Sequence, residues 1–297
     1  MNTQVLQGLL VPFLGTTLGA ALVFFLKRDL PEKVQKGLSG FAAGVMVAAS
    51  IWSLLIPALE GAADLGAWSF LPATIGFWLG ILFLLLLDRL VPHVHLDGEQ
   101  EGLRTSLPRS MMVALAVALH NLPEGMAVGV VYAGSMQPEQ VGSVSFASAF
   151  ALAVGIALQN VPEGAIVAMP LRQAGMSRVK AFTLGMLSGA VEPLGALLTI
   201  GLAAVFAPMM PVMLSFAAGA MLYVVVEELV PEMAQGTHTN VGTVLFAVGF
   251  SIFPSALRTV STASGSTFSN VTVPRLCSAK FLNQTQSLPL SPELSLT

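Results

Sequence analysis

Cysteine and charge are both scarce in this chain of 297 residues. The single cysteine, Cys277, excludes a disulfide framework and a thiolate metal cluster. Charged residues make up only 10% of the chain, and 13 Lys and Arg against 16 Asp and Glu give a net charge of −3. Nucleic-acid binding needs a basic patch, so that class of partner is excluded. Any metal ligands must therefore be nitrogen, oxygen or thioether groups.

Long apolar segments dominate the rest of the sequence. Hydrophobic residues reach 55% and the mean hydropathy is +0.79, outside the usual range of a soluble domain. The first apolar run is longer than a signal-peptide core and has no basic residue ahead of it, so we expect it to be retained. We predict an all-α integral membrane protein. Stretches of about 20 residues, long enough to cross a bilayer as helices, occur at 5–26, 38–59, 69–91, 110–131, 146–169, 180–206 and 208–231, and an eighth begins near Val241.

Lys and Arg occur in the first, third and fifth connections of these predicted spans, and the seventh connection has none. The second, fourth and sixth connections have none. Positive residues favour the cytoplasmic side, so the odd connections should be cytoplasmic and the N-terminus outside. We expect a multi-pass protein of the plasma membrane or bacterial inner membrane. The basic residues are Lys27, Arg28, Lys33 and Lys36 in the first connection, Arg89, Arg104 and Arg109 around the third, and Arg172, Arg178 and Lys180 in the fifth.

Glycine pairs four residues apart recur in the predicted spans. Small residues at this spacing let two helices approach closely in lipid, so we interpret the pairs as packing contacts of a helix bundle. They are Gly15 and Gly19, Gly40 and Gly44, Gly76 and Gly80, Gly125 and Gly129, and Gly185 and Gly189.

One internal repeat carries polar chemistry. The segments LAVALHNLPEGMAVG (115–129) and AVGIALQNVPEGAIVA (153–168) share the core His/Gln-Asn-x-Pro-Glu-Gly at a separation of 39 residues. A single external connection lies between them, so the two helices run in opposite directions. An inverted pair of this kind, facing itself near the midplane, is typical of the substrate site of a carrier.

Each copy of the repeat places three polar residues on one helix face. His120, Asn121 and Glu124 are three and four residues apart, and Gln159, Asn160 and Glu163 repeat the spacing. Pro123 and Pro162 lack an amide hydrogen, so we expect a kink at each cluster and free backbone carbonyls at Leu119 and Leu158. Glu192 lies about halfway along the sixth predicted span.

Glu124, Glu163 and Glu192 need positive compensation. An isolated charge at the centre of a bilayer costs about 2.5–3.5 kcal/mol on insertion scales. The second, fourth, fifth and sixth spans contain no Lys or Arg, so a proton or a bound cation must supply the charge. Carboxylates with a neutral imidazole suit Zn²⁺, Fe²⁺, Mn²⁺ or Co²⁺ better than Ca²⁺, and a thioether from Met46 would extend the set to Cd²⁺ and copper. We predict a transported metal ion and no prosthetic group.

The motifs HNLPEG (120–125) and QNVPEG (159–164) resemble the paired metal-binding motifs of the ZIP family of metal transporters. GFAAGVMVAAS (40–50) and SGAVEP (188–193) are similar to the GufA-like branch, and the resemblance covers about residues 5–250. It implies an eight-helix bundle in a 3+2+3 arrangement with both termini outside. It also implies transport of zinc or another divalent metal toward the cytoplasm, often by a homodimer.

The resemblance further implies a site with two metal positions. Asn160 occupies a place where some family members have a carboxylate, which implies weaker binding at the second position. The first position would use Met46, His120, Glu124, Gln159 and Glu163, and the second Asn121, Glu124, Asn160, Glu163 and Glu192.

Further acidic and histidine residues lie outside the repeat. We interpret the cytoplasmic loop 92–109, which contains His93, His95, Asp97, Glu99 and Glu101, as solvated. Glu60 and Asp64 fit either an external entrance or a solvated surface. Glu227, Glu228 and Glu232 fit either an exit site or a hydrated helix end.

The resemblance stops after Phe250. The apolar run from Val241 to Leu257 has at most 17 residues and is interrupted by Pro254, so we expect an eighth helix that is atypical or incomplete. We therefore predict a transporter domain at 1–253 and a polar, disordered tail at 254–297.

An intramembrane metallohydrolase is the alternative from another class. In such an enzyme, a metal held by His120 and Glu124 would activate a water molecule. These enzymes usually carry His-Glu-x-x-His or a comparable histidine set, whereas no predicted span has a second histidine. The sequence thus favours a metal carrier that is not an enzyme.

Overall fold

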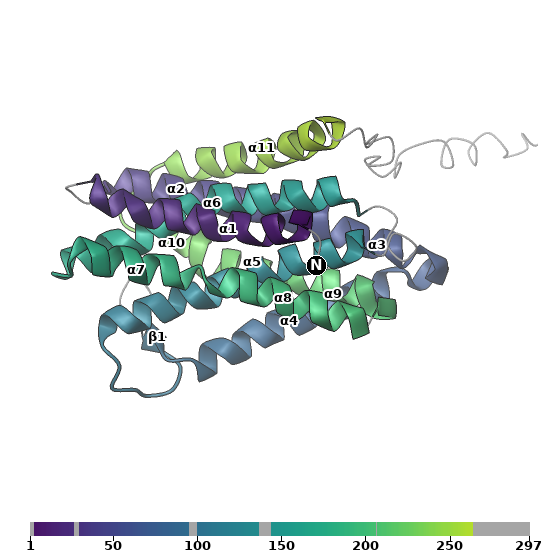
Figure 1. Cartoon of the computed structure of the whole chain (residues 1–297), viewed down its shortest axis with the longest axis horizontal. Coiled ribbons are helices and arrows are strands. Elements are labelled where there is room, and N and C mark those ends of the chain that lie inside the picture. Colours follow the sequence, from purple (N-terminus) through teal and green to yellow (C-terminus); the bar gives the residue numbers. More distant parts are fainter. Residues whose placement is uncertain (1–2, 27–29, 95–99, 137–143, 206, 264–297) are drawn as a thin grey trace, which may run out of the picture.

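The computed structural model describes residues 3–26, 30–94, 100–136, 144–205 and 207–263. These residues form a helix bundle in which most helices lie along one long axis (Figure 1). A two-stranded hairpin of two residues per strand joins α4 to α5. The elements are α1 (Thr3–Ala21), η1 (Leu22–Phe24), α2 (Glu32–Ala49), η2 (Ser50–Leu55), α3 (Ile56–Gly61), η3 (Ala63–Trp68), α4 (Phe70–Leu90), β1 (His93–Val94), β2 (Gln100–Glu101), α5 (Arg109–Ser135), α6 (Phe146–Gln173), α7 (Arg178–Ser188), α8 (Val191–Val205), η4 (Ala207–Met209), α9 (Met210–Val224), η5 (Val225–Leu229), α10 (Val230–Ala234) and α11 (Val241–Ala263).

Seven helical segments are long and apolar enough to cross a membrane, and their positions match the seven predicted spans. Large apolar side chains such as Trp78, Leu79 and Leu82 of α4 point away from the protein core. Outward apolar side chains are what a lipid-facing helix requires. The chain is a multi-pass integral membrane protein with an all-α fold.

The eighth helix is present but short in its apolar part, as expected. Its apolar stretch, Val241–Leu257, is shorter than the other seven. Helix α11 nevertheless continues through Pro254 to Ala263, past the predicted domain boundary at 254. It packs along α2 at the edge of the bundle (Figure 1). The rest of the predicted tail, with Cys277, lies outside the described residues.

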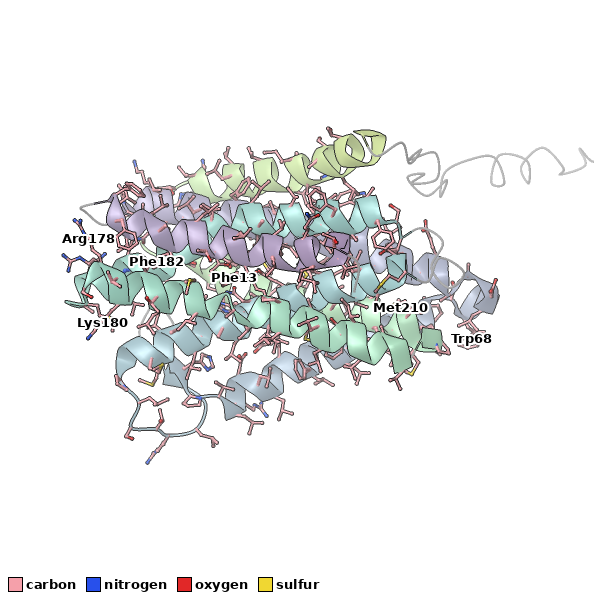
Figure 2. The ribbon with its side chains drawn as sticks, viewed as in Figure 1. Phe13, Trp68, Arg178, Lys180, Phe182 and Met210 are labelled. Carbon is pink, nitrogen blue, oxygen red and sulfur yellow. The ribbon has the colours of Figure 1, made fainter. Side chains whose placement is uncertain are left out.

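The two ends of the bundle differ as the alternation of charge predicts. Arg178 and Lys180, from the fifth connection, lie at one end, and Trp68, from the second connection, lies at the other (Figure 2). The β1–β2 hairpin of the third connection lies at the same end as α7 (Figure 1). Residues of odd and even connections therefore lie at opposite ends of the molecule. We refer to the end with Arg178 and Lys180 as the basic end.

Four of the five glycine pairs bring helix backbones into direct contact, which confirms the packing interpretation. At each of their glycines a Cβ atom would collide with a backbone carbonyl of the partner helix. The resulting helix pairs have the most extensive contacts in the bundle. The pairs are α1 with α6 through Gly15 and Gly19, α2 with α11 through Gly40 and Gly44, α4 with α9 through Gly76 and Gly80, and α5 with α8 through Gly125 and Gly129.

The sixth predicted span, 180–206, is present, but it consists of two helices, and the break between them was not predicted. Helix α7 ends at Ser188 and α8 begins at Val191, with a turn at Gly189 and Ala190. Glycine is a poor interior residue for a helix, and Pro193 cannot donate a hydrogen bond to the turn before it. The break places Glu192 in the first turn of α8, where the helix dipole favours a negative charge.

Two helices contain a widened π turn that the sequence analysis did not predict. The turns are η2, which follows α2, and η5, which follows α9. Each precedes a proline, Pro57 or Pro231, that removes one amide hydrogen from the helix. Single π turns of this kind occur frequently at functional sites.

One histidine of the third connection is buried, so the prediction of a solvated loop was wrong there. His93 is 1% exposed and its Nδ1 donates a hydrogen bond to the carbonyl of Val91, at 2.8 Å. Its Nε2 lies 3.9 Å from Asp88, which accepts a hydrogen bond from the Tyr223 hydroxyl. These contacts attach the loop to α4 and α9. His95, Asp97 and Glu99 lie outside the described residues.

Candidate metal centre

The two copies of the repeat lie on neighbouring helices, α5 and α6, in the interior of the bundle. Asn121, Glu124, Gln159 and Asn160 are fully buried, and Glu192 of α8 is 1% exposed. Both helices continue through their prolines, Pro123 and Pro162. The expected polar cluster is thus enclosed by protein.

Direct hydrogen bonds join the two copies. The Gln159 side chain on α6 donates from Nε2 to Oε1 of Glu124 on α5. The same nitrogen donates to Oδ1 of Asn160, at 2.8 Å. The Asn160 side chain also lies against the carboxylates of Glu124 and Glu192. Amides of one helix therefore lie between two acids of other helices.

The break between α7 and α8 takes part in this cluster. The carbonyl of Ser188, at the end of α7, accepts a hydrogen bond from Nδ2 of Asn121, at 3.1 Å. Thr16 of α1 donates from Oγ1 to Oε1 of Glu192, at 2.7 Å. A continuous helix would use the Ser188 carbonyl internally. The break therefore gives Asn121 its orientation.

Several oxygen atoms in the cluster have no hydrogen-bond partner within the described residues. Buried acceptors are nearly always paired, so a group of unpaired ones at one place indicates a site for a ligand with positive charge or donor hydrogens. The atoms are Oε2 of Glu124, Oε2 of Glu163, Oε2 of Glu192, Oδ1 of Asn121 and Oε1 of Gln159.

His120 contacts a residue that the sequence analysis did not assign to the site. Its Nε2 pairs with Oε1 of Glu228 on the π turn η5. Both side chains are about one-sixth exposed, at 15% and 16%. Glu227, the residue just before it in the chain, is exposed. The order acid, acid and then Pro231 was the available signal, because a proline can widen the preceding turn and turn one acid inward.

Glu163 lines an inner cavity of the bundle. The cavity measures about 60 Å³, and its polar lining residues are Ser39, His120, Glu163, Glu228 and Glu232. The carboxylates of Glu124, Glu192, Glu228 and Glu232 all interact electrostatically with that of Glu163. Five acids thus share one region of the bundle interior.

Met46 lies apart from these polar contacts. It is fully buried on α2 within the main apolar core. Helix α2 packs against α6, which carries Gln159, Asn160 and Glu163. Met46 is therefore on the helix expected for a thioether ligand, whereas the structure gives its sulfur no polar contact among the described residues.

The donors suit a transition metal, although the side chains are bonded to one another. No three His, Cys, Asp or Glu side chains of the described residues are arranged to hold an ion directly. The Gln159 amide is hydrogen-bonded to one oxygen of Glu124, and Glu228 is paired with Nε2 of His120. Rotation of these side chains would free an imidazole nitrogen and several carboxylate oxygens, which are ligands that Zn²⁺ accepts.

The fold and this cluster define a class: a multi-pass membrane protein with a buried, acid-rich polar centre. A family model described as the ZIP zinc transporter matches residues 95–253. The chain belongs to the ZIP family. It is 33% identical to human zinc transporter ZIP11 over 86% of this chain and 97% of the relative. It is 37% identical to zinc transporter ZIPB of Bordetella bronchiseptica over 81% of this chain and 76% of the relative. It is also 37% identical to zinc transporter GufA of Myxococcus xanthus over 80% of this chain and 91% of the relative. These relatives agree with the resemblance to the GufA-like branch.

Proposed function

We propose that this protein carries divalent transition-metal ions, with zinc first among them, across the membrane through the centre on α5, α6 and α8. The observation that supports this most is the group of unpaired oxygens on Glu124, Glu163 and Glu192 in the bundle interior. No Lys or Arg of the described residues is among the groups that interact electrostatically with these three carboxylates. A dication would compensate these acids and satisfy their free acceptors at once.

The distribution of donors supports two metal positions. His120 lines the inner cavity, and Gln159 contacts Glu124. Together with Glu163 they would serve the first position. Asn121, Asn160 and Glu192 lie around the break at Ser188, and would serve the second. Met46 would complete the first position from α2. Mixed nitrogen and oxygen donors also accept Fe²⁺, Mn²⁺ and Co²⁺, so selectivity within this group needs direct competition.

The inner cavity supports movement toward the basic end, which the positive-inside rule assigns to the cytoplasm. His120, Glu163, Glu228 and Glu232 all line this cavity, and Glu232 also lines a pocket beside Lys36. An ion leaving Glu163 would therefore meet further carboxylates on its way out. The resemblance to the family also implies a homodimer, which chemical crosslinking of the inserted protein would test.

A hydrolase finds less support in the same geometry. Hydrolytic metal sites keep an open position for water beside a histidine-rich ligand set. Here the described spans provide one histidine, His120, and its nitrogen contacts Glu228. We therefore infer a carrier that is not an enzyme.

Uptake of ⁶⁵Zn²⁺ into proteoliposomes tests the proposal. The full chain should take up zinc when Zn²⁺ is supplied outside, and unlabelled Cd²⁺, Fe²⁺ or Mn²⁺ should compete, whereas Mg²⁺ should not. The triple variant E124Q/E163Q/E192Q should insert and show no uptake above empty liposomes. Absence of zinc uptake by the inserted wild-type chain, or equal uptake by the triple variant, would refute the proposal.

A further inference from the structure

A buried lysine lies near the basic end of the bundle, outside the centre described above. Lys36 of α2 has a side chain only 4% exposed. Among the Lys and Arg residues whose side chains the structure describes, no other is buried. A lysine is almost never buried unless it is paired, so its position calls for a specific reason.

Two oxygens hold the Lys36 ammonium. Its Nζ lies 2.9 Å from Oε1 of Glu32, one helical turn earlier, and donates to the carbonyl of Thr237 after α10. The same Glu32 oxygen accepts the backbone amide of Thr237 at 3.1 Å and the Thr237 hydroxyl at 3.3 Å. Gly236 has a φ of +70°, and a Cβ there would run into the Glu32 carboxylate. The start of α2 and the segment after α10 are thus tied together around one positive charge.

This contact lies beside a second pocket that continues the route from the metal centre. We call it the mouth pocket; it measures about 390 Å³, and its lining includes Glu32, Lys36, Ile166, Glu232 and Gly236. Ile166 and Glu232 also line the inner cavity beneath His120 and Glu163. Glu232 therefore lies between the inner cavity and the pocket that Lys36 lines.

We propose that Lys36 is a release residue: a tethered positive charge that prevents the acids of the mouth pocket from retaining the metal ion. This inference rests on the proposed function. With Lys36 in place, the charge of Glu32 is neutralised. Without it, Glu32 and Glu232 form a pair of carboxylates on one pocket, which is an adequate binding site for a dication. Lys36 thereby sets how fast an ion that has passed Glu232 leaves the protein.

The substitution K36M, which removes the positive charge, tests this role. In proteoliposomes we expect the maximal rate of ⁶⁵Zn²⁺ uptake to fall about tenfold, because the unpaired Glu32 now holds the departing ion. The external zinc concentration for half-maximal uptake should change little, since entry does not pass Lys36. Equilibrium ⁶⁵Zn²⁺ binding to detergent-purified protein should rise by one ion per chain.

Two further variants separate charge compensation from a purely structural role. The double variant E32Q/K36M removes both charges, so its uptake rate should return to within about twofold of wild type and the additional bound ion should disappear. K33M removes the same charge from an exposed position on the same helix and should leave the uptake rate and the zinc stoichiometry unchanged. Rescue by removal of a second charge is not expected of a lysine that only stabilises the fold.

Each outcome decides the inference. An unchanged or faster rate in K36M, or a double variant as slow as K36M, would overturn it. If K36M fails to insert, the double variant still decides, because a slow double variant would contradict charge compensation. A wild-type chain that takes up no zinc would overturn the proposed function and this inference together, whereas normal wild-type uptake with an unchanged K36M would overturn this inference alone.

Discussion

The cores of the two repeat copies in α5 and α6 share Asn, Pro, Glu and Gly but differ in their contacts. The shared glycines do the same work: Gly125 packs on the backbone of Glu192 in α8, and Gly164 packs on that of Thr16 in α1. The variable first position differs. His120 turns to Glu228 on a third segment, whereas Gln159 turns to Glu124 of the other copy. The shared residues thus build the scaffold, and the difference at the first position divides the polar centre. The half with His120 contacts the segment of Glu228, and the half with Gln159 contacts the other copy of the repeat.

If the two glutamates are equivalent, neutralising either should have the largest effect. We expect E124Q and E163Q each to reduce ⁶⁵Zn²⁺ uptake to the background of empty liposomes, because each removes a charge from a site without basic compensation. The amount of protein reconstituted per liposome, and its size-exclusion profile in detergent, should be unchanged. E227Q, which neutralises an exposed glutamate outside the centre, is the control and should transport normally. Substantial uptake by only one of the two variants would show that the copies are unequal at this position as well.

Making the first positions identical should have the next largest effect. H120Q converts the α5 copy to the α6 pattern and replaces an imidazole with an amide. We expect zinc uptake to fall by at least about 10–100-fold, because replacing a ligand should cost no less than removing a group that supports one. Competition by Mn²⁺ should strengthen relative to Zn²⁺, because oxygen donors suit manganese better. Unchanged uptake and unchanged competition in H120Q would remove His120 from the site.

Removal of the third segment's contact should cost less. E228Q leaves His120 in place but removes the carboxylate that holds its Nε2. We expect about a tenfold loss of uptake, the lower end of the range for partners of a metal ligand. E227Q, one residue away and exposed, again provides the matched control. Equal behaviour of E228Q and E227Q would mean that the pairing of His120 with Glu228 has no functional role.

The shared glycines should affect stability more than transport. In G125A and G164A the new methyl group meets the backbone of the partner helix, and overpacking of this kind costs about 1–3 kcal/mol. We expect both variants to show a lower Tm in detergent and nearly normal uptake per inserted molecule. At Gly201 a Cβ would meet no atom within 4 Å, so G201A should keep the wild-type Tm. A Tm in G125A equal to that of G201A would contradict the close approach of α5 and α8.

Spans and repeat were predictable because their signals are local. Apolar length located seven spans, and the spacing of His120, Asn121 and Glu124 predicted their common helix face. The glycine spacing correctly predicted close packing, although it could not say that Gly40 and Gly44 contact α11, just over 200 residues away in sequence. Partner choice depends on tertiary structure, which no single spacing encodes.

The unpredicted features depend on backbone irregularity. The break at Gly189 is absent from hydropathy, because a short turn leaves the apolar run intact. The π turn that directs Glu228 to His120 is equally invisible, since a residue inserted into a helix does not alter composition. His93 carried an ordinary loop pattern, and only its contact with Asp88 explains its burial. Proline and glycine near acidic residues in a span therefore deserve as much scrutiny as the acids themselves.

The wide turn at Val225–Leu229 also fixes the rotational phase of the chain beyond it. If Val225–Leu229 formed regular α turns with no change of sequence, the segment beyond them would be rotated by about 100° and moved by about 1.5 Å along the helix axis. Glu232 would then leave the wall between the two cavities, and Thr237 would move out of reach of Lys36. The rotation set by this single helix turn thus positions both Glu232 at the inner cavity and Thr237 beside Lys36.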